Sequence, residues 1–433
     1  MLQQYSKRGF SVAGSMLWRC ALAAALFFGA AEAGAVKCDK LLDVNTGKIL
    51  VDQIVVFDKT GIITDVGPAT AMAAPPDTII LPGRTCLPGL IDAHVHLTGD
   101  ATDHGYQALG ISIPAEAIKG VKNARITLLA GFTAVRNVGA SGFTDVALRD
   151  AVNADDVPGP RMLVSGPMIS ITGGHGDDNL LPYEFHHSEQ GVADGPWALR
   201  AKVREIVKYG ADLIKISASG GVLSKGASPG AEQLTPEEMQ AIVAEAHKLG
   251  RKVAAHAHGT QAIKDAILAG VDSVEHASLI DAEGIKLAKE HGTYLVFDIY
   301  NDDFILAEGP KHGMLPESIE KEKKIGRLQR ENFKKAFLGG AKMAFGTDAA
   351  VYPHGDNAKQ FAKMVQWGMK PIDAIRAATL NAADLMGWKD TVGVLAPGHY
   401  ADIVAVTGDP LADVTVLEHV SFVMKGGIVV KGP

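Results

Sequence analysis

Two stretches of the sequence, Gly250–His258 (GRKVAAHAH) and Gly270–His276 (GVDSVEH), follow one plan: a glycine, a short apolar run and a terminal histidine. A glycine just past a helix end adopts the left-handed conformation that stops the helix. The apolar run that follows it is typical of a buried parallel strand. Each stretch therefore predicts the passage from a helix into a strand of a parallel sheet, with histidine at the carboxyl end.

The same plan recurs through the central part of the chain. In four more places an apolar run begins within three residues of a glycine that ends a helix-like segment, at Gly131, Gly210, Gly292 and Gly340. Two further apolar runs, residues 89–94 and 160–165, complete a set of eight βα units. Eight such units in about 300 residues favour a TIM barrel over a doubly wound sheet.

The two ends of the chain show a different sequence pattern. Residues 36–88 contain three short β-type runs separated by turns, and residues 401–430 contain three more. Short runs of this kind, bounded by glycine and other turn residues, are typical of small antiparallel β units. We therefore expect an α/β protein whose barrel is flanked by β structure at both ends.

The first 33 residues show the three parts of a secretory signal peptide. Basic residues such as Lys7 and Arg19 precede a small and apolar run, residues 21–31, and an Ala-Glu-Ala site, residues 31–33. The run is shorter than the roughly 20 residues that span a bilayer. We expect residues 1–33 to be removed, leaving a secreted or periplasmic protein with no stable membrane span. The alternative is an uncleaved amphipathic N-terminal helix.

Composition excludes several classes of protein. The 433 residues carry 42 Lys+Arg and 49 Asp+Glu, a net charge of −7, and 47% of them are hydrophobic. The chain can build a large core, and it lacks the basic surface that binds nucleic acid. Three cysteines are too few for a disulfide framework or a Cys-rich zinc module. In an exported chain Cys38 and Cys86 can form a disulfide, but the sequence does not show whether they meet.

Polar residues stand at the ends of five of the eight predicted strands. They are His94, His96, Lys215, His256, His258, His276 and Asp348. The carboxyl ends of TIM-barrel strands converge on one face, where active sites lie, and strand alternation puts His94 and His96 on the same side. A single strand histidine is usually a satisfied core residue, but buried polar groups in this number need one another or a shared partner. The set predicts a metal site, for which zinc suits and manganese, cobalt or iron are chemically allowed.

Lys215 is the unusual member of this set, because an ammonium group cannot bind a cation and is costly to bury beside one. One reading is a lysine that faces outward and extends its amine to solvent. The other is that CO2 adds to the neutral amine, giving a carbamate whose two oxygens bridge two metal ions.

Several of these motifs resemble the metal-dependent amidohydrolase superfamily. They are Pro88–His96 (PGLIDAHVH), the strand-four Lys215, the two later histidines and the final Gly-Thr-Asp, residues 346–348. Two others, Lys215–Ser224 (KISASGGVLS) and Gly173–Asp177 (GGHGD), are similar to the imidazolonepropionase-like branch. That branch includes Xaa-Pro and Xaa-Arg dipeptidases and ochratoxin-hydrolysing amidases.

The resemblance covers nearly all of residues 36–431 and implies two domains. A (β/α)8 barrel would occupy residues 88–389, and a small β-sandwich would be built from residues 34–87 and 390–433. The resemblance also implies homo-oligomers and two zinc ions per chain, with these ligands: His94, His96 and Asp348 for one ion, His256 and His276 for the other, and carboxylated Lys215 as the bridge.

The resemblance further implies a hydrolytic mechanism. A hydroxide bridging the two ions would be the nucleophile, because metal coordination lowers the pKa of water to about 7. Asp348 is placed to take its proton and pass it to the leaving amine. His175 or His258 could hydrogen-bond the developing oxyanion. For His175 the alternative is a mobile glycine-rich surface loop.

Three more residues are expected to contact substrate: Arg136, Tyr183 and Ser224. Arg136 could bind a substrate carboxylate through two hydrogen bonds, or it could support the barrel through an ion pair. Tyr183 follows the His175 loop, and Ser224 ends the strand-four motif.

The leading hypothesis is an amidohydrolase that cleaves the amide joining an acyl group or amino acid to a C-terminal amino acid. Its substrates would be dipeptides, N-acyl amino acids and amides of the ochratoxin type, in which ochratoxin A yields ochratoxin alpha and phenylalanine. The alternative within the superfamily is a cyclic amide or imine hydrolase or a deaminase; many of those sites hold one metal and lack the bridging lysine. A more remote alternative is a non-catalytic binding protein, since a fold alone does not fix function.

Overall fold

The structure, a computed structural model, describes residues 33–432, so the expected signal peptide, apart from its last residue, lies outside the described residues. Seven short parallel strands form the centre of the larger domain: β5 (Leu90–Val95), β6 (Phe132–Asn137), β7 (Arg161–Val164), β8 (Leu213–Ser217), β9 (Lys252–Ala257), β10 (Ser273–His276) and β11 (Tyr294–Val296). They are almost wholly buried, as continuous apolar runs predict.

Hydrogen bonds connect these strands in sequence. They form two parallel sheets, β5-β6-β7 and β8-β9-β10-β11. The backbone N–H of Asp212 donates to the Val164 carbonyl at 2.8 Å and so links β7 to the start of β8. Residues 343–349 fill the remaining gap through two parallel bridges, Leu295–Met343 and Val95–Ala349. The strands and this segment therefore close into a ring of the TIM-barrel type.

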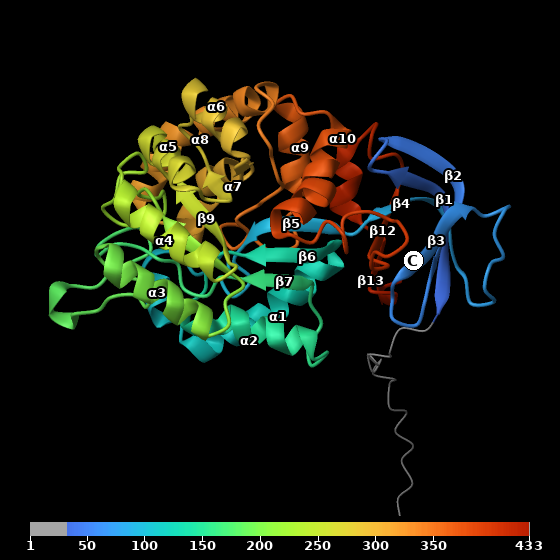
Figure 1. Ribbon diagram of the computed structural model, residues 1–433, viewed down its shortest axis with the longest axis horizontal. Coiled ribbons are helices and arrows are strands. Elements are labelled where there is room, and N and C mark those ends of the chain that lie inside the picture. Colours follow the sequence, from blue (N-terminus) through green and yellow to red (C-terminus); the bar gives the residue numbers. More distant parts are fainter. Residues whose placement is uncertain (1–32, 433) are drawn as a thin grey trace, which may run out of the picture.

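Helices surround the ring, as Figure 1 shows. They are α1 (Ile113–Leu129), α2 (Thr144–Asn153), α3 (Pro196–Lys208), α4 (Pro236–Lys248), α5 (Thr260–Ala269), α6 (Ala282–His291), α7 (Asn301–Ala307), α8 (Pro316–Leu338), α9 (Lys359–Gln366), α10 (Pro371–Arg376) and α11 (Ala382–Met386). Helices α5 and α6 end at Gly270 and Gly292, whose φ angles of 94° and 72° confirm the predicted left-handed caps.

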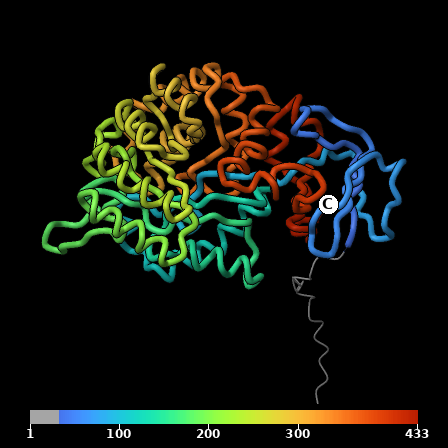
Figure 2. Tube along the Cα trace, viewed as in Figure 1, coloured from blue at the N-terminus to red at the C-terminus, as the bar shows by residue number. Residues whose placement is uncertain are grey.

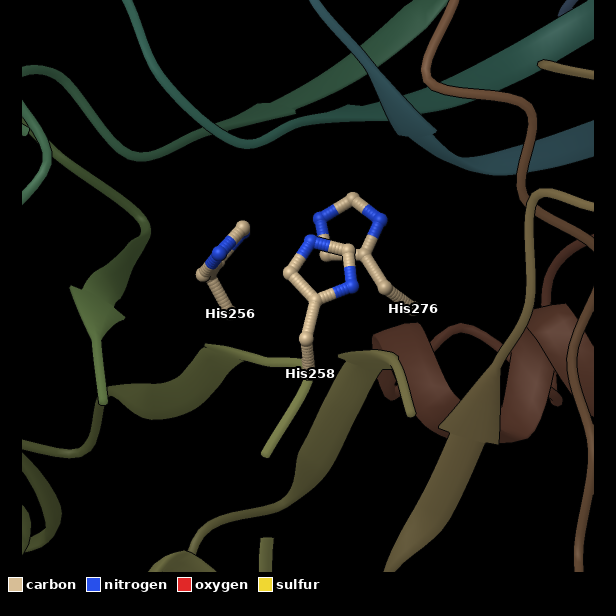
Figure 3. Close-up of side chains that lie close together, drawn as sticks. All are labelled: His256, His258 and His276. Atoms are coloured by element: carbon tan, nitrogen blue, oxygen red, sulfur yellow. The ribbon is translucent and has the colours of Figure 1, made fainter. Parts of the chain in front are cut away.

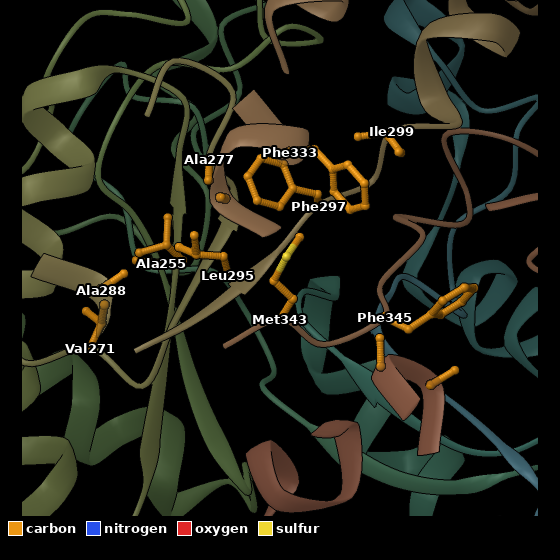
Figure 4. Close-up of a cluster of buried hydrophobic side chains, with 14 of the residues drawn as sticks. Ala255, Val271, Ala277, Ala288, Leu295, Phe297, Ile299, Phe333, Met343 and Phe345 are labelled. Carbon is orange, nitrogen blue, oxygen red and sulfur yellow. The ribbon is translucent and has the colours of Figure 1, made fainter. Parts of the chain in front are cut away.

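The core lies between the strands and the outer helices (Figure 4). Phe297, just after β11, packs against Phe333 of α8 with ring centroids 5.6 Å apart. Both side chains are buried. This contact fixes the long helix α8 beside the carboxyl end of β11, where it can contribute side chains to the same end of the barrel.

The two ends of the chain meet in a second, smaller domain (Figures 1 and 2). Its strands are β1 (Gly34–Asp43), β2 (Lys48–Phe57), β3 (Ile63–Pro68), β4 (Ile79–Pro88), β12 (Ile403–Thr407), β13 (Phe422–Lys425) and β14 (Ile428–Lys431). All seven are joined in one sheet of order β14-β13-β12-β4-β1-β2-β3, where a sandwich of two sheets was expected. Strand β4 pairs with β1 on one side and β12 on the other, and this unites both chain ends.

One pairing in this domain corrects the antiparallel prediction. Strands β1 and β4 run parallel, because residues 69–78 carry the chain back across the sheet before β4 begins. The same pairing brings Cys38 of β1 and Cys86 of β4 together, and they form a disulfide with Cα atoms 6.0 Å apart. The sequence had left this bond open. Among residues 33–432, no helix combines the length and apolar character needed to cross a membrane.

Candidate metal centre

The carboxyl ends of the barrel strands enclose a pocket of about 250 Å³. Eight of the residues singled out in the sequence line it: His94, His96, His175, Lys215, His256, His258, His276 and Asp348. The prediction that strand-end residues meet at one place is therefore confirmed. Arg136, Tyr183 and Ser224 are not among the residues that line the pocket.

The first group of possible metal ligands comes from the two ends of the barrel segment. The Nε2 atoms of His94 and His96 lie 3.3 and 3.2 Å from the same oxygen of Asp348, Oδ1. Asp348 has a φ angle of 57°, a left-handed conformation that is uncommon outside glycine. Such strained positions cluster at functional sites, where the surrounding structure holds them.

The second group comes from β9 and β10. The rings of His256, His258 and His276 lie with centroids 4.6 to 4.8 Å apart, and Figure 3 shows them gathered above the strand ends. One nitrogen of each lies close enough to the others to share an ion. By distance alone His258 is as good a ligand as His256, although the sequence pattern assigned it to substrate.

The hydrogen-bond partner of the outer ring nitrogen distinguishes His256 from His258. Each of four rings has one nitrogen facing an oxygen that can only accept: His94 Nδ1 faces Glu275 at 2.8 Å, His96 Nδ1 faces the Gly139 carbonyl at 3.1 Å, His256 Nε2 faces the Gly220 carbonyl at 3.2 Å, and His276 Nδ1 faces Asp298 at 3.0 Å. In a neutral ring that nitrogen carries the proton, so the other nitrogen carries a lone pair. His258 Nδ1 faces the Ser278 hydroxyl at 2.7 Å, which can donate as well as accept.

The inward nitrogens are therefore suited to a metal ion. His94 Nε2 is buried and makes no well-formed hydrogen bond, although Asp348 Oδ1 lies 3.3 Å away. A buried polar atom of this kind is costly unless something binds it. Imidazole nitrogens and a carboxylate, each oriented by an outer hydrogen bond, are the usual ligands of zinc and related divalent metals. The residues present fit such an ion.

Lys215 lies in the same pocket with 2% of its surface exposed, which excludes the outward-facing alternative. No ion pair of its ammonium group is present within the described part of the chain. Burial lowers the pKa of Lys215 to about 8. A larger fraction of the amine is consequently neutral near pH 7 than for an exposed lysine, and the neutral amine is the form that can react with CO2.

His175 is held against the histidine cluster. Its ring stacks on that of His256 with centroids 4.0 Å apart, and its Nδ1 is buried without a hydrogen-bond partner. Burial lowers the pKa of His175 to about 3, so the ring is neutral. The loop is anchored, since the backbone N–H of His175 donates to Gln233 at 2.9 Å. A Cβ atom at Gly221 would lie 2.2 Å from the His175 ring, so the ring can take this place only beside glycine.

Arg136 serves the barrel and not the pocket. Its guanidinium is buried and donates to the Ala93 carbonyl at 2.6 Å, to Ser273 at 2.8 Å and to Glu275 at 2.8 Å. These bonds leave it no free face for a substrate carboxylate, and of the two roles considered the structural ion pair is the one observed. Burial by itself would raise the pKa of Glu275, but Arg136 and His94 hold that pKa well below its ordinary value.

Two other expected substrate contacts are corrected by the structure. Tyr183 is 82% exposed on a short 3-10 turn, Tyr183–Phe185, because the chain leaves the pocket after the His175 loop. The Ser224 hydroxyl turns back to the Gly221 carbonyl at 3.2 Å. Its neighbours Val222 and Leu223 line the pocket in its place.

Other pocket residues were missed by the sequence analysis: Ser278, Asp298, Asn301, Glu322 and Gln329. Asp298 had a usable signal, because it directly follows an apolar strand run as the histidines do. It holds His276 and accepts hydrogen bonds from Asn301 and Gln329, both at 2.6 Å. The latter two stand on helices, where no strand-end pattern could identify them.

We predict that Arg136→Met destabilises the protein without removing a pocket contact. The change leaves the buried Glu275 carboxylate without its arginine partner, which costs about 3–5 kcal/mol of the free energy of unfolding. Thermal unfolding followed by circular dichroism would show a clearly lower midpoint. The exposed Arg327→Met on α8 is the matched control, with no shift expected. An unchanged midpoint for Arg136→Met would contradict the structural role.

The chain was compared with known proteins. The model of the amidohydrolase family matches residues 85–430. Ochratoxinase from Aspergillus niger is 34% identical in an alignment of 414 positions that covers 90% of this chain and 83% of that protein. A solved Xaa-Pro dipeptidase with bound methionine superposes with a TM-score of 0.86 at 37% identity, covering 93% of this chain and all of the other. The A. niger ochratoxinase structure gives 0.83 at 30% identity, with 94% and 97% covered.

Both relatives fall in the branch that the motifs at residues 173–177 and 215–224 resemble. The family model spans the barrel and the C-terminal half of the smaller domain, and the structural match covers 93% of the chain. The chain belongs to the amidohydrolase family.

Proposed function

We propose that this protein is a binuclear zinc amidohydrolase that cleaves the amide bond to a C-terminal amino acid. One observation supports this most strongly: four imidazoles turn a lone pair into one pocket, each fixed by an outer oxygen that can only accept a hydrogen bond. Asp348 and Lys215 lie in the same pocket. The family membership supports the hydrolytic chemistry.

In this proposal His94, His96 and Asp348 would hold one ion, His256 and His276 would hold the other, and a carbamate on Lys215 would supply an oxygen ligand to each. The two ions would supply an acidified water as nucleophile and polarise the scissile carbonyl. His256 is preferred to His258 because its outer nitrogen faces a carbonyl oxygen, which leaves its inner nitrogen free to bind metal.

Asp348 is the proposed proton carrier. Burial would raise its pKa, but His94 and His96 hold that pKa well below the ordinary value, so the carboxylate is ionised at neutral pH. Its other oxygen, Oδ2, accepts a long hydrogen bond from Asn301 at 3.4 Å. A carboxylate oriented in this way can accept a proton from the attacking water and deliver it to the leaving amine.

His258 and His175 are the proposed oxyanion contacts. When the Ser278 hydroxyl donates to His258 Nδ1, the proton of the ring sits on Nε2 and faces the pocket. Burial lowers the pKa values of both histidines, which keeps the rings neutral. Neutral imidazole donors aimed at a developing oxyanion stabilise it without competing for the proton that Asp348 carries.

The pocket suits a small substrate with apolar parts. Its walls away from the histidines are apolar: Val222, Leu223, Ile305, Ile325 and Val351. A volume of about 250 Å³ accommodates a dipeptide or a similar acylated amino acid. The relatives named as an ochratoxinase and a Xaa-Pro dipeptidase are consistent with an amide whose leaving group is an amino acid. We also propose export of the chain, which the disulfide between Cys38 and Cys86 supports.

The first test is release of amino acids by the purified, zinc-loaded protein from a panel of dipeptides and N-acyl amino acids with varied C-terminal residues. Selective release is expected, and Asp348→Asn should lower it by at least about 10³-fold because the proton carrier is lost. Asp390→Asn, an exposed residue far along the chain, is the control and should behave as wild type. Failure to release an amino acid from any member would overturn the proposed reaction.

A second prediction concerns Lys215→Met. The bound metal should fall from two ions per chain to one or fewer, because the bridge is lost while the remaining side chain still fills the space. Elemental analysis after gel filtration measures this content directly. The exposed Lys286→Met on α6 should keep two ions. Two tightly held ions in Lys215→Met would show that the lysine is not the bridge.

A third prediction tests the position of His175. In Gly221→Ala the new methyl group displaces the His175 ring, and kcat should fall at least about tenfold with the loss of an oxyanion contact. The metal content should stay the same. Gly110→Ala is a matched control, since a Cβ atom there meets nothing within 4 Å. If Gly221→Ala has wild-type kcat, His175 takes no part in the reaction.

A further inference from the structure

Helix α8 places an acidic residue in the pocket. Residues 321–324 read Lys-Glu-Lys-Lys, a run of charges that is typical of a solvated helix face. In the structure Glu322 is only 4% exposed and lines the pocket, while Lys323 and Lys324 are exposed. One residue of this charged run therefore points inward.

The periodicity of α8 explains this inward position. Glu322 shares its buried stripe with Ile325, Gln329 and Phe333, at the spacing of one helix face. Phe333 packs on Phe297, and Gln329 donates to Asp298 at 2.6 Å. The helix is thus fixed against the carboxyl end of β11, and Glu322 lies in the lining of the pocket that holds the candidate metal ligands.

The Glu322 carboxylate accepts no hydrogen bond and forms no ion pair among residues 33–432. Its acidic neighbour Asp302 pairs with Arg330 at 2.7 Å, and Asp298 is held by Gln329. A Cβ atom at Gly326 would lie 2.6 Å from Glu322 Oε1, so this glycine leaves room for the carboxylate. Burial, with Asp302 and Asp298 nearby, raises the pKa of Glu322 to about 8.

The other charged side chains of the pocket differ from Glu322 in having partners or an assigned role. Asp100 and Asp103 also line it, but they are paired with lysines outside its lining, Lys122 and Lys119. Apart from the histidines, Lys215 is the single cationic side chain in the lining of this pocket, and the proposed function assigns it to the metals. The pocket thus offers a ligand a free carboxylate and no arginine.

We propose that Glu322 is a specificity residue that binds a cationic nitrogen of the substrate. The inference rests on the proposed function and narrows its substrate class to amides that carry an ammonium or guanidinium group in the acyl half. A dipeptide with a free α-amino group has one, and so does a basic side chain. An N-acyl amino acid without a cation lacks the partner that the buried carboxylate needs. Charge-assisted hydrogen bonds of this kind are strong in a desolvated site.

The test uses pairs of amides that differ in one cation. Alanyl-phenylalanine against propionyl-phenylalanine isolates the α-ammonium group, and lysyl-phenylalanine against norleucyl-phenylalanine isolates a side-chain ammonium. The wild-type enzyme should favour the cationic member of at least one pair by about tenfold or more in kcat/KM. The pair that shows the preference identifies which nitrogen Glu322 binds.

Glu322→Gln should abolish that preference and leave the uncharged member within about twofold of wild type. Glu320→Gln, two residues earlier on the exposed face of α8, is the matched control and should keep the preference. A wild-type enzyme without preference in either pair would overturn the inference. Equal losses for charged and uncharged members in Glu322→Gln would also overturn it.

Two further measurements distinguish cation binding by Glu322 from a structural role and from failure of the proposed reaction. The thermal midpoint of Glu322→Gln should stay close to that of wild type, because the carboxyl group that is replaced makes no hydrogen bond or ion pair among residues 33–432; a large fall would indicate a structural role. Calorimetric binding of alanyl- and propionyl-phenylalanine to the Asp348→Asn variant tests cation binding without turnover. If no amide is hydrolysed but Glu322 still governs binding of the cationic member, the proposed reaction fails and the cation site stands.

Discussion

The buried carboxylate of Glu275, held between Arg136 and His94, is the interaction on which the site depends. Its oxygens accept from the Arg136 guanidinium and from His94 Nδ1, both at 2.8 Å, and it has no exposed surface. Burying two such charges is costly unless the geometry satisfies both. Here it connects β10 to β6 and β5, and it fixes His94 with its proton outward and its lone pair toward the pocket.

The rest of the site repeats this arrangement with other acceptors. Carbonyls of Gly139 and Gly220 and the carboxylate of Asp298 orient three more imidazoles. The barrel supplies the positions, because the carboxyl ends of its strands converge, and left-handed residues at His276 and Asp348 turn the chain sharply where the strands stop. The backbone of the fold therefore positions the candidate metal ligands, whereas the side chains proposed to select a substrate come from α8 and from loops.

The position of the strand-end histidines could be predicted from the sequence. Strand-end histidines are readable because a glycine and an apolar run locate each strand, and strand geometry then places His94 and His276 at the same end of the barrel. Arg136 was harder, since a strand arginine can face a substrate or a buried acid, and only the place of Glu275 decides between them.

The sequence predictions were wrong where the local pattern does not determine which way a side chain or strand points. Tyr183 and Ser224 follow motifs whose loops turn away from the pocket, and loop conformation is not encoded in spacing. Glu322 stands in a run of charges that suggests solvent, yet the face of α8 decides which charge is buried. The parallel pairing of β1 with β4, and the disulfide it permits, depends on a crossover that short strand patterns do not reveal.

The central claim is that two metal ions lie among these side chains and that Lys215 joins them. Anomalous diffraction from crystals of the zinc-loaded protein, recorded on both sides of the zinc absorption edge, tests it most directly. The account predicts two anomalous peaks about 3.5–4 Å apart, with electron density extending beyond Lys215 Nζ to both. A single peak, or density that ends at the amine, would contradict it.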